Sequence, residues 1–201
     1  MQVHSGHCAS TVRSSHCEPA FVDGSYAMLG AQQLSAVRRG YAGSVVEAKE
    51  RGICDRAARL HYRRLRDFLV GPDSRSPVRL FTSAPDGSSA LRIGRLMRDC
   101  GFLPYIALRA GGSREKRVDT EMAISLVEET CELPRGAVVT LVAGDDDFTP
   151  AVQRLVRRGL KIDLVGWEYS ISRDLRSLAR RVIMLDQHFA SLVICDARSL
   201  H

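Results

Sequence analysis

Residues 137–150 read AVVTLVAGDDDFTP. A run of mostly apolar residues ends at Gly144, and the run is typical of a buried strand because it is short, apolar on both faces and rich in β-branched residues. Three carboxylates follow it directly: Asp145, Asp146 and Asp147. Thr149 and Pro150 then suit the N-cap and the first position of a helix. Adjacent carboxylates repel one another, so water, backbone N–H groups or a metal ion must offset their charge.

Strand-like and helix-like segments alternate along most of the chain on both sides of this stretch. The strands that we expect cover residues 19–26, 78–84, 102–110, 137–143, 160–167 and 182–186, with a further short one at 191–195. The helices that we expect between them cover residues 45–69, 88–101, 118–133, 149–159 and 174–181. Alternation of this kind predicts an α/β fold with a parallel sheet that is covered by helices on both sides.

The connection between the first two strands is the least regular part. Residues 45–69 place apolar residues at helical spacing and arginines on the opposite face, which predicts one long amphipathic helix. That arginine face suits either solvent or a phosphate backbone. Residues 30–50 are richer in glycine and longer than a minimal connection requires. We expect them to form a lid or a partner-binding insert.

The length and composition fit a globular protein with one main domain. The chain has 201 residues, of which 45% are hydrophobic, enough for a sizeable core. Lys and Arg outnumber Asp and Glu by 29 to 23, and this excess favours either a polyanionic partner or a simply basic surface. No apolar run is long enough to span a membrane, and the N-terminus lacks the apolar segment of a secretory signal. The six cysteines form no C-x-x-C pair, which fits reduced thiols in the cytoplasm.

Three regions follow from these patterns. Residues 1–18 are rich in Ser and His and poor in large apolar residues, so we expect a flexible N-terminal tail. Its histidines and cysteines do not have the spacing of a zinc site. Residues 19–186 carry the alternating pattern and form the expected domain, and residues 187–201 form a C-terminal extension.

Several carboxylates stand where the expected strands end or helices begin. Asp23 closes the first strand, and Asp145 and Asp147 follow the fourth. Asp145 and Asp147 are two positions apart, so both can point the same way in an extended turn. Asp119 begins the helix that follows a basic, glycine-rich loop at 111–117. Because ligands of parallel α/β sheets bind at the carboxyl ends of the strands, these acids share one crevice if the first and fourth strands are neighbours.

A crevice with four carboxylates favours a bound cation, since the acids otherwise raise one another's pKa. Oxygen ligands suit Mg²⁺ or Mn²⁺, which can activate water and stabilise an in-line displacement at phosphorus. Each acid also has an ordinary structural explanation. Asp145 can make an Asx-turn, Asp147 can cap a helix, Asp119 suits the first turn of a helix, and Asp23-Gly24 can form a turn. The coincidence of three separate segments favours a metal site.

The residues also resemble a known family, the NYN domains of the PIN-like nuclease superfamily, which are also seen in LabA-like proteins. The resemblance covers roughly residues 20–186. It rests on three segments in this order: FVDGSY (21–26), KRVDTEMAISLVEE (116–129) and LVAGDDDFTPAVQRLVRRGLKIDLVGW (141–167). Its most specific parts are Lys116-x-x-Asp119 and Gly144-Asp145-x-Asp147-Phe148. It implies a PIN-like three-layer fold with a parallel sheet of about five to six strands covered by helices on both faces.

The resemblance further implies a ribonuclease that cleaves RNA, single-stranded in our interpretation, with Mg²⁺ or Mn²⁺. The family's catalytic and metal-binding positions match Asp23, Asp119, Asp145 and Asp147. The residues expected to contact the substrate are Lys116 from the motif, its neighbours Arg114 and Arg117, and Tyr26. The chain departs from the family pattern at Tyr26, where Asn is common, and at Ala143, where Ser precedes Gly-Asp. These departures concern substrate contacts and turnover and leave the acids intact.

Other functions remain open at this stage. An NYN-fold module that binds RNA or a protein partner, with weak or no catalysis, is favoured by Tyr26, Ala143 and the arginines of 51–66. A phosphatase of the haloacid dehalogenase type needs Asp-x-Asp after its first strand, and Asp23-Gly24-Ser25 lacks the second acid. A dinucleotide-binding Rossmann domain needs G-x-G-x-x-G after a strand, which is absent. The sequence is compatible with a homo-oligomer but does not specify one. We favour the ribonuclease.

Overall fold

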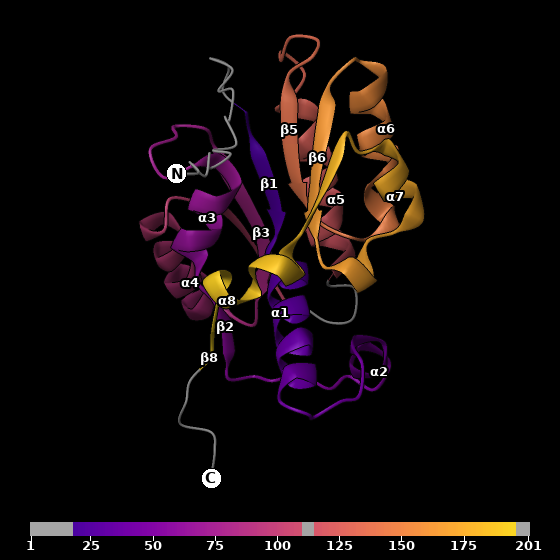
Figure 1. The fold of residues 1–201 in the computed structure, drawn as a ribbon. Coiled ribbons are helices and arrows are strands. Elements are labelled where there is room, and N and C mark those ends of the chain that lie inside the picture. Colours follow the sequence, from indigo (N-terminus) through magenta and orange to yellow (C-terminus); the bar gives the residue numbers. More distant parts are fainter. Residues whose placement is uncertain (1–17, 110–114, 196–201) are drawn as a thin grey trace, which may run out of the picture.

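The computed structural model describes residues 18–109 and 115–195, and of Glu115 and Lys116 it describes only the backbone. Its centre is a six-stranded sheet in the order β4-β3-β1-β5-β6-β7, and every pairing in this sheet is parallel (Figure 1). Its strands are β1 (Ala20–Asp23), β3 (Val78–Ala84), β4 (Leu103–Leu108), β5 (Val138–Val142), β6 (Lys161–Gly166) and β7 (Arg181–Met184). The six strands expected for the main sheet are therefore all present.

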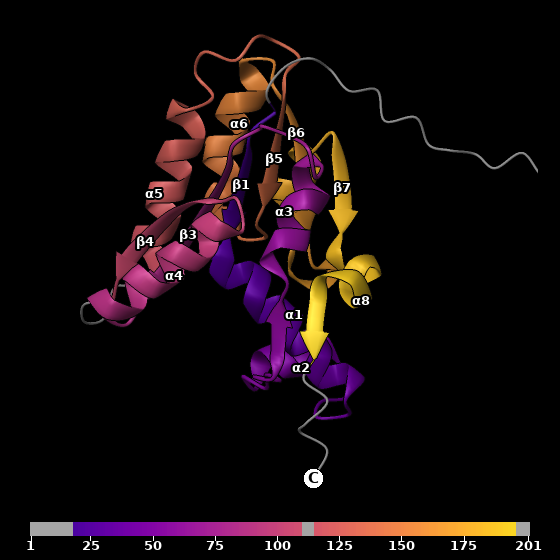
Figure 2. The same cartoon turned by 90° about the vertical axis from the view of Figure 1, so that its left-hand side faces the viewer.

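Helices cover both faces of this sheet. One face carries α1 (Gly24–Arg38), α3 (Tyr62–Val70), α4 (Gly87–Asp99) and α8 (Phe189–Leu192). The other carries α5 (Glu115–Glu128), α6 (Thr149–Arg157) and α7 (Arg173–Leu178). Figure 2 shows α5 and α6 on one side of the sheet and α3 and α8 on the other. The three-layer α/β fold expected from the sequence is confirmed.

The alternation of side chains along β1 explains why the strand needs helices on both sides. Ala20 and Val22 pack into the apolar cluster beneath α1, whereas Phe21 packs into the opposite cluster beneath α5 and α6. All three side chains are completely buried. Because successive side chains of a strand point to opposite faces, an apolar residue at every position calls for a covered sheet.

The single long helix expected over residues 45–69 is wrong. The structure has a short helix, α2 (Val45–Glu50), then strand β2 (Ala58–Leu60), and then α3. The chain leaves α2 at Gly52, where the backbone φ is +64°, a conformation that glycine adopts without a steric penalty. The arginines of this segment are in part structural. Arg64 donates to the carbonyl of Ser191 at 3.2 Å, and Arg66 donates to the carbonyl of Gly71 at 2.8 Å.

The glycine-rich insert expected over residues 30–50 is also wrong in its first part, because residues 24–38 form α1 against the sheet. Ala27 and Ala31 of this helix are completely buried. The glycines and other small residues let the helix pack closely. They give no clear apolar stripe, because glycine has a low helix propensity and small side chains are only weakly hydrophobic. That is why the sequence pattern did not indicate a helix here.

The chain ends, as far as they are described, are tied to the domain. The N-terminal tail that we expected to be flexible lies outside the described residues, except for Glu18. The segment expected as a C-terminal extension continues through η3 (Leu185–His188) and α8 into β8 (Val193–Cys195), which pairs antiparallel with β2. Phe189 and Leu192 are buried in the same core as α1.

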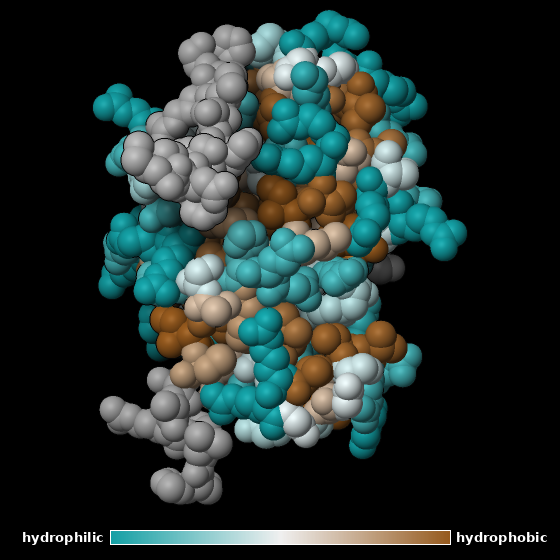
Figure 3. All heavy atoms as spheres, in the orientation of Figure 1, coloured by the Kyte–Doolittle hydropathy of each residue, from teal (hydrophilic) through white to brown (hydrophobic). Residues whose placement is uncertain are grey.

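The surface mixes polar and apolar residues. Figure 3 shows apolar side chains in several places on this face, including the lower half of the view, where α1, α2 and β8 lie. Of the residues there, Tyr41, Val46 and Ile194 are each about half exposed. Among the described residues, no helix combines the length and apolar character that crossing a membrane requires.

A close contact between Gly30 and Trp167 fixes α1 against the sheet. Trp167 follows β6 and is completely buried, and its indole Nε1 donates to the carbonyl of Ala27 at 3.3 Å. A Cβ atom on Gly30 would lie 2.1 Å from Cδ1 of this indole. The helix can therefore approach the ring only because residue 30 has no side chain.

We expect Gly30→Ala to lower the free energy of unfolding by about 1–3 kcal/mol, because the added methyl group overpacks a rigid aromatic contact. Gly87→Ala is the matched control, since a Cβ there meets nothing within 4 Å and residue 87 is also helical. Urea unfolding followed by far-UV circular dichroism measures both. Equal unfolding midpoints for the two variants would contradict this packing.

Candidate functional site

The topology of the sheet creates a switch point between β1 and β5. From β1 the chain continues outward through β3 to β4 on one side, and then returns to β5 on the other side of β1. Val22 of β1 is in register with Val142 of β5. The carboxyl ends of these two strands are therefore neighbours, which meets the condition under which the sequence places the acids in one crevice, and ligands of such sheets bind at this point.

Asp23 stands at the end of β1 and also caps α1. Its Oδ1 accepts a hydrogen bond from the backbone N–H of Tyr26 at 2.9 Å. The residue is 9% exposed. The helix N-terminus stabilises a negative charge at this position. The carboxylate is therefore held in a fixed place at the switch point.

The three consecutive acids after β5 have different surroundings. Asp145 caps the short 3₁₀ helix η1 (Asp146–Phe148) and accepts a hydrogen bond from the N–H of Asp147 at 3.1 Å. Asp146 accepts from the hydroxyls of Thr149 at 2.8 Å and Ser172 at 3.1 Å, so it joins the starts of α6 and α7. Thr149 is the first residue of α6, whose N-cap is Phe148, so the N-cap expected at Thr149 is wrong. A backbone N–H and two hydroxyls offset part of the charge that the sequence places here.

A cleft of about 570 Å³ opens above the switch point. Asp23, Asp119 and Asp145 all line it, and they come from β1, α5 and the turn after β5. The other polar residues that line it are Ser25, Tyr26, Gln33, Lys49, Ser83, Asp146, Tyr169, Ser170 and Ser172. The structure therefore brings three of the four predicted acids to one cleft.

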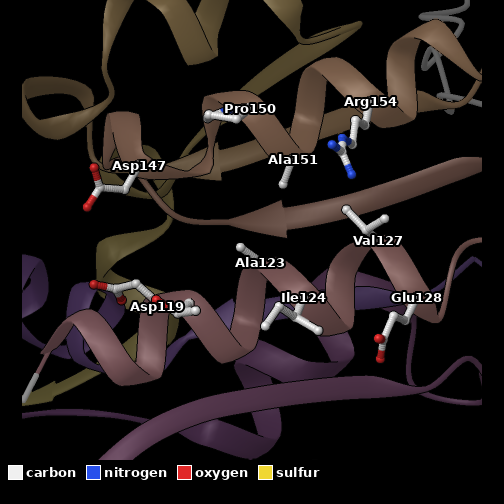
Figure 4. A pocket seen from close by; sticks show the side chains of 10 residues that line it. Asp119, Ala123, Ile124, Val127, Glu128, Asp147, Pro150, Ala151 and Arg154 are labelled. Carbon is white, nitrogen blue, oxygen red and sulfur yellow. The ribbon is translucent and has the colours of Figure 1, made fainter.

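The fourth acid, Asp147, lines an adjoining groove of about 610 Å³ between α5 and α6. Figure 4 shows Asp147 and Asp119 at one end of this groove and Arg154 and Glu128 toward the other. The lining between these ends is mainly apolar and consists of Ala123, Ile124, Val127, Pro150 and Ala151. Asp119 lines both hollows, so the groove and the acidic cleft adjoin at this residue.

The donor set can be compared with what a divalent cation requires. No group of three His, Cys, Asp or Glu side chains within the described residues is close enough to hold a metal ion. The acids therefore do not form a ready-made cage. Mg²⁺ is commonly held by only one or two carboxylates and keeps several waters. Hard carboxylate oxygens lining an open cleft fit a cation of this kind.

Tyr26 lines the cleft, but its hydroxyl is engaged within the protein. The oxygen accepts from the N–H of Trp167 and from the hydroxyl of Ser170, each at 2.9 Å. A Cβ on Gly144 or on Gly166 would lie 2.8 Å or 2.4 Å from this oxygen. Burial is the main cause that raises the pKa of Tyr26 to about 12. The ring thus joins α1 to the ends of β5 and β6.

The structure describes only some of the basic residues that the sequence predicted to contact the substrate. Arg114 lies outside the described residues. Lys116 lies in the first turn of α5, and its side chain is outside the described part. Arg117 is exposed in the same turn but is not among the described side chains that line the cleft.

Sequence reasoning missed Lys49, which lines the cleft from α2. The missed helix α1 carries α2 to this place, so no local pattern around Lys49 could have indicated it. Tyr169, which also lines the cleft, donates its hydroxyl toward Gln33 Oε1 at 3.2 Å and the carbonyl of Gly30 at 3.3 Å.

Comparison with known proteins agrees with this geometry. The family model of the NYN domain matches residues 46–186. The chain belongs to the NYN domain family. The matched range includes Asp119, Asp145 and Asp147 and begins after Asp23. NYN domains are in general ribonuclease-like hydrolases, and PIN-like nucleases usually use divalent metal ions. The likeness to LabA-like proteins stays a prediction.

Two further similarities concern proteins without a described function. An uncharacterized protein of Methanocaldococcus jannaschii is 34% identical over 89 residues, which is 44% of this chain and 34% of the relative. The match thus spans about a third of that curated relative. A crystal structure of a protein of unknown function from Vibrio parahaemolyticus aligns with a TM-score of 0.54 and 16% identity over 90% of this chain and 99% of that chain. At this identity the likeness shows the fold alone.

We expect Tyr26→Phe to lower the free energy of unfolding at neutral pH by about 1–2 kcal/mol, because the N–H of Trp167 loses its acceptor. The pH dependence should change as well. Tyr26 ionises near pH 10 when unfolded and near pH 12 when folded, so wild-type stability falls between these values as the unfolded chain releases the proton first. Removing the hydroxyl should remove the contribution of one titrating proton from the slope of the free energy of unfolding against pH.

Urea unfolding of both proteins from neutral pH to about pH 11 tests this expectation. Tyr105→Phe is the control, since this tyrosine lies on the edge strand β4 and away from the cleft. An identical pH dependence in wild type and Tyr26→Phe would contradict the engaged hydroxyl.

Proposed function

We propose that this NYN domain is a metal-dependent ribonuclease that hydrolyses phosphodiester bonds of single-stranded RNA with Mg²⁺ or Mn²⁺. One observation carries the proposal. Asp23, Asp119 and Asp145 lie far apart in sequence and line one cleft at the switch point of the sheet. Membership of a family of ribonuclease-like hydrolases supports the same reaction class.

Local structure alone explains these acids incompletely. Asp23 and Asp145 each use Oδ1 to accept one backbone N–H. Asp147 is exposed, and its carboxylate accepts no hydrogen bond from the residues that the structure describes. Capping and turn formation therefore explain the placement of Asp23 and Asp145, but not that of the Asp147 carboxylate.

We assign roles according to these positions. Asp119 and Asp145 would hold the cation, with Asp23 and Asp147 on either side as further carboxylates. When bound, the cation supplies positive charge against the charge that develops on the phosphoryl oxygens and favours deprotonation of water. The protein holds Asp23 and Asp145 in fixed orientations through the N–H groups of Tyr26 and Asp147. Such preorganisation lowers the cost of reaching the transition state.

Other residues would position the RNA. The hydroxyls of Ser25, Ser83 and Ser172 line the cleft and are of the type that donates to phosphate oxygens. Arg114, Lys116 and Arg117 precede Asp119 in the chain, and we propose that they hold the RNA backbone. Tyr26 would contact the substrate through its ring, since its hydroxyl is engaged.

The cellular compartment is part of the proposal. Cys54, Cys100, Cys131 and Cys195 are free thiols. Thiols of this kind suit a reducing compartment. We propose the cytoplasm.

The decisive experiment is cleavage of labelled single-stranded RNA in Mn²⁺ by wild type and by Asp145→Asn. We expect the variant to lose activity by about a hundredfold or more, because a carboxylate that acts on the transition state is removed. Asn also makes Asx-turns and caps helices, so the fold should persist and circular dichroism can verify it. Excess EDTA should abolish wild-type cleavage.

Asp73→Asn is the matched control, because Asp73 is an exposed acid in the loop before β3 and lies outside the cleft. It should retain full activity. Equal cleavage by Asp145→Asn and wild type would overturn the proposal. RNA binding by wild type without any cleavage would instead support a binding module with an inactive acidic cleft.

A further inference from the structure

Lys49 is the one basic residue among the described side chains that line the acidic cleft. The same cleft is lined by the carboxylates of Asp23, Asp119 and Asp145. Lys49 is exposed, and within the described residues its ammonium group makes no ion pair with an acid. A cation placed against several acids without neutralising any of them directly calls for an explanation.

The backbone of Lys49 is held firmly although its side chain is exposed. Ser44 caps α2 by accepting from the N–H of Glu47 at 3.1 Å, and the Glu47 carboxylate accepts from the N–H of Gly43 at 2.8 Å. Arg51 pairs with the same carboxylate at 2.6 Å. Ala48, the residue before Lys49, is completely buried, and α2 packs against α1. Lys49 therefore extends from a fixed base.

Helix α2 offers Lys49 no acid at ion-pairing spacing, because Val45 and Val46 stand one turn before it and Glu47 is engaged elsewhere. Glu47 is bonded to Gly43 and Arg51, and these two contacts hold the pKa of its carboxyl below the usual value, with the Gly43 bond as the larger cause. The ammonium group of Lys49 thus keeps its charge available on the cleft side. A lysine in this setting acts as a compact point charge with three donors.

A negatively charged strand that enters an acidic cleft meets repulsion. A single-stranded RNA carries a phosphate at every nucleotide, and each contact with Lys or Arg adds favourable, salt-dependent free energy. Lys49 faces the acids from the α1–α2 side, whereas Asp119 and Asp145 come from α5 and from the turn after β5. A strand that lies between them would have acids on one side and the ammonium group on the other.

We propose that Lys49 binds a phosphate of the RNA strand in the acidic cleft and so sets the position of the strand relative to the acids. This inference rests on the proposed function of the cleft as the RNA site. Lys49 acts on substrate binding and is not a ligand of the cation. Its contribution is a single phosphate contact that comes from α2, which is separate in sequence from the basic residues 114–117.

The test uses full-length wild type, Lys49→Gln and Lys49→Arg, with Lys161→Gln as the control. Lys161 is an exposed lysine at the amino end of β6, whereas the cleft lies at the carboxyl ends of the strands. Fluorescence anisotropy of a short, labelled oligouridylate in EDTA, at several KCl concentrations, gives the affinity and its dependence on salt.

We expect Lys49→Gln to weaken binding about threefold to fivefold, as one exposed ion pair would. The slope of log affinity against log salt should become shallower by about 0.7, the value of one phosphate contact to a single strand. Lys49→Arg should keep the wild-type slope because it keeps the charge. Lys161→Gln should behave like wild type in both respects.

An unchanged slope in Lys49→Gln, or an equal change in Lys161→Gln, would overturn the inference. So would a wild type that does not bind the oligouridylate. Cleavage assays in Mn²⁺ separate this result from the fate of the nuclease proposal. If wild type does not cleave RNA but the salt slope still depends on Lys49, the nuclease proposal alone is overturned. Wild-type cleavage with a KM that Lys49→Gln leaves unchanged would overturn the phosphate contact alone.

Discussion

The hydroxyl of Tyr26 is the contact on which the geometry of the site depends. It reaches from the first turn of α1 across the ends of β5 and β6 and accepts hydrogen bonds from Trp167 and Ser170. The ring can reach this position because Gly144 and Gly166 have no side chains. Gly144 directly precedes Asp145, and the N–H of Tyr26 itself holds Asp23. One residue therefore fixes the two strand ends that carry the acids relative to each other.

This arrangement gives a physical meaning to the two departures from the family pattern. Tyr26 occupies a position where Asn is common, and its long side chain makes a structural bond that a shorter amide could not reach in the same way. Ala143 occupies a position where Ser is common, and it is completely buried in the cluster beneath α5 and α6. A methyl group there needs no hydrogen-bond partner, whereas a hydroxyl would. Both residues are accommodated in the packing around the acids and leave the carboxylates in place.

The sequence predicted the strands of the sheet and the acids at their ends, because apolar runs followed by acids are local signals, whereas the strand order came from the structure. It did not predict α1, because this helix contains Gly24, Gly30 and several alanines and lacks the large apolar residues at helical spacing that identify a helix. We wrongly expected α2 and α3 to form one helix, because the helical spacing of apolar residues continues past the turn at Gly52. Lys49 could not be found for the same reason, since its place at the cleft depends on how α1 carries α2 across the sheet. Each acid had a local signal in the sequence, whereas Lys49 had none.

The net charge of the chain and the charged groups of the cleft act on a polyanion at different distances. The chain carries a net charge of +6, which attracts polyanions at long range. At physiological ionic strength such attraction is screened beyond about 8 Å, so groups inside the cleft decide how a strand is held there. Among the described residues, the charged groups that line the cleft are four carboxylates and one lysine, and the carboxylates oppose a phosphate unless positive charge accompanies it. Because Lys49 makes no ion pair with these acids among the described residues, it adds attraction without closing the site to a divalent cation. Under the proposed function, a bound divalent cation would offset these carboxylates, so binding of the strand and readiness for catalysis would rise together.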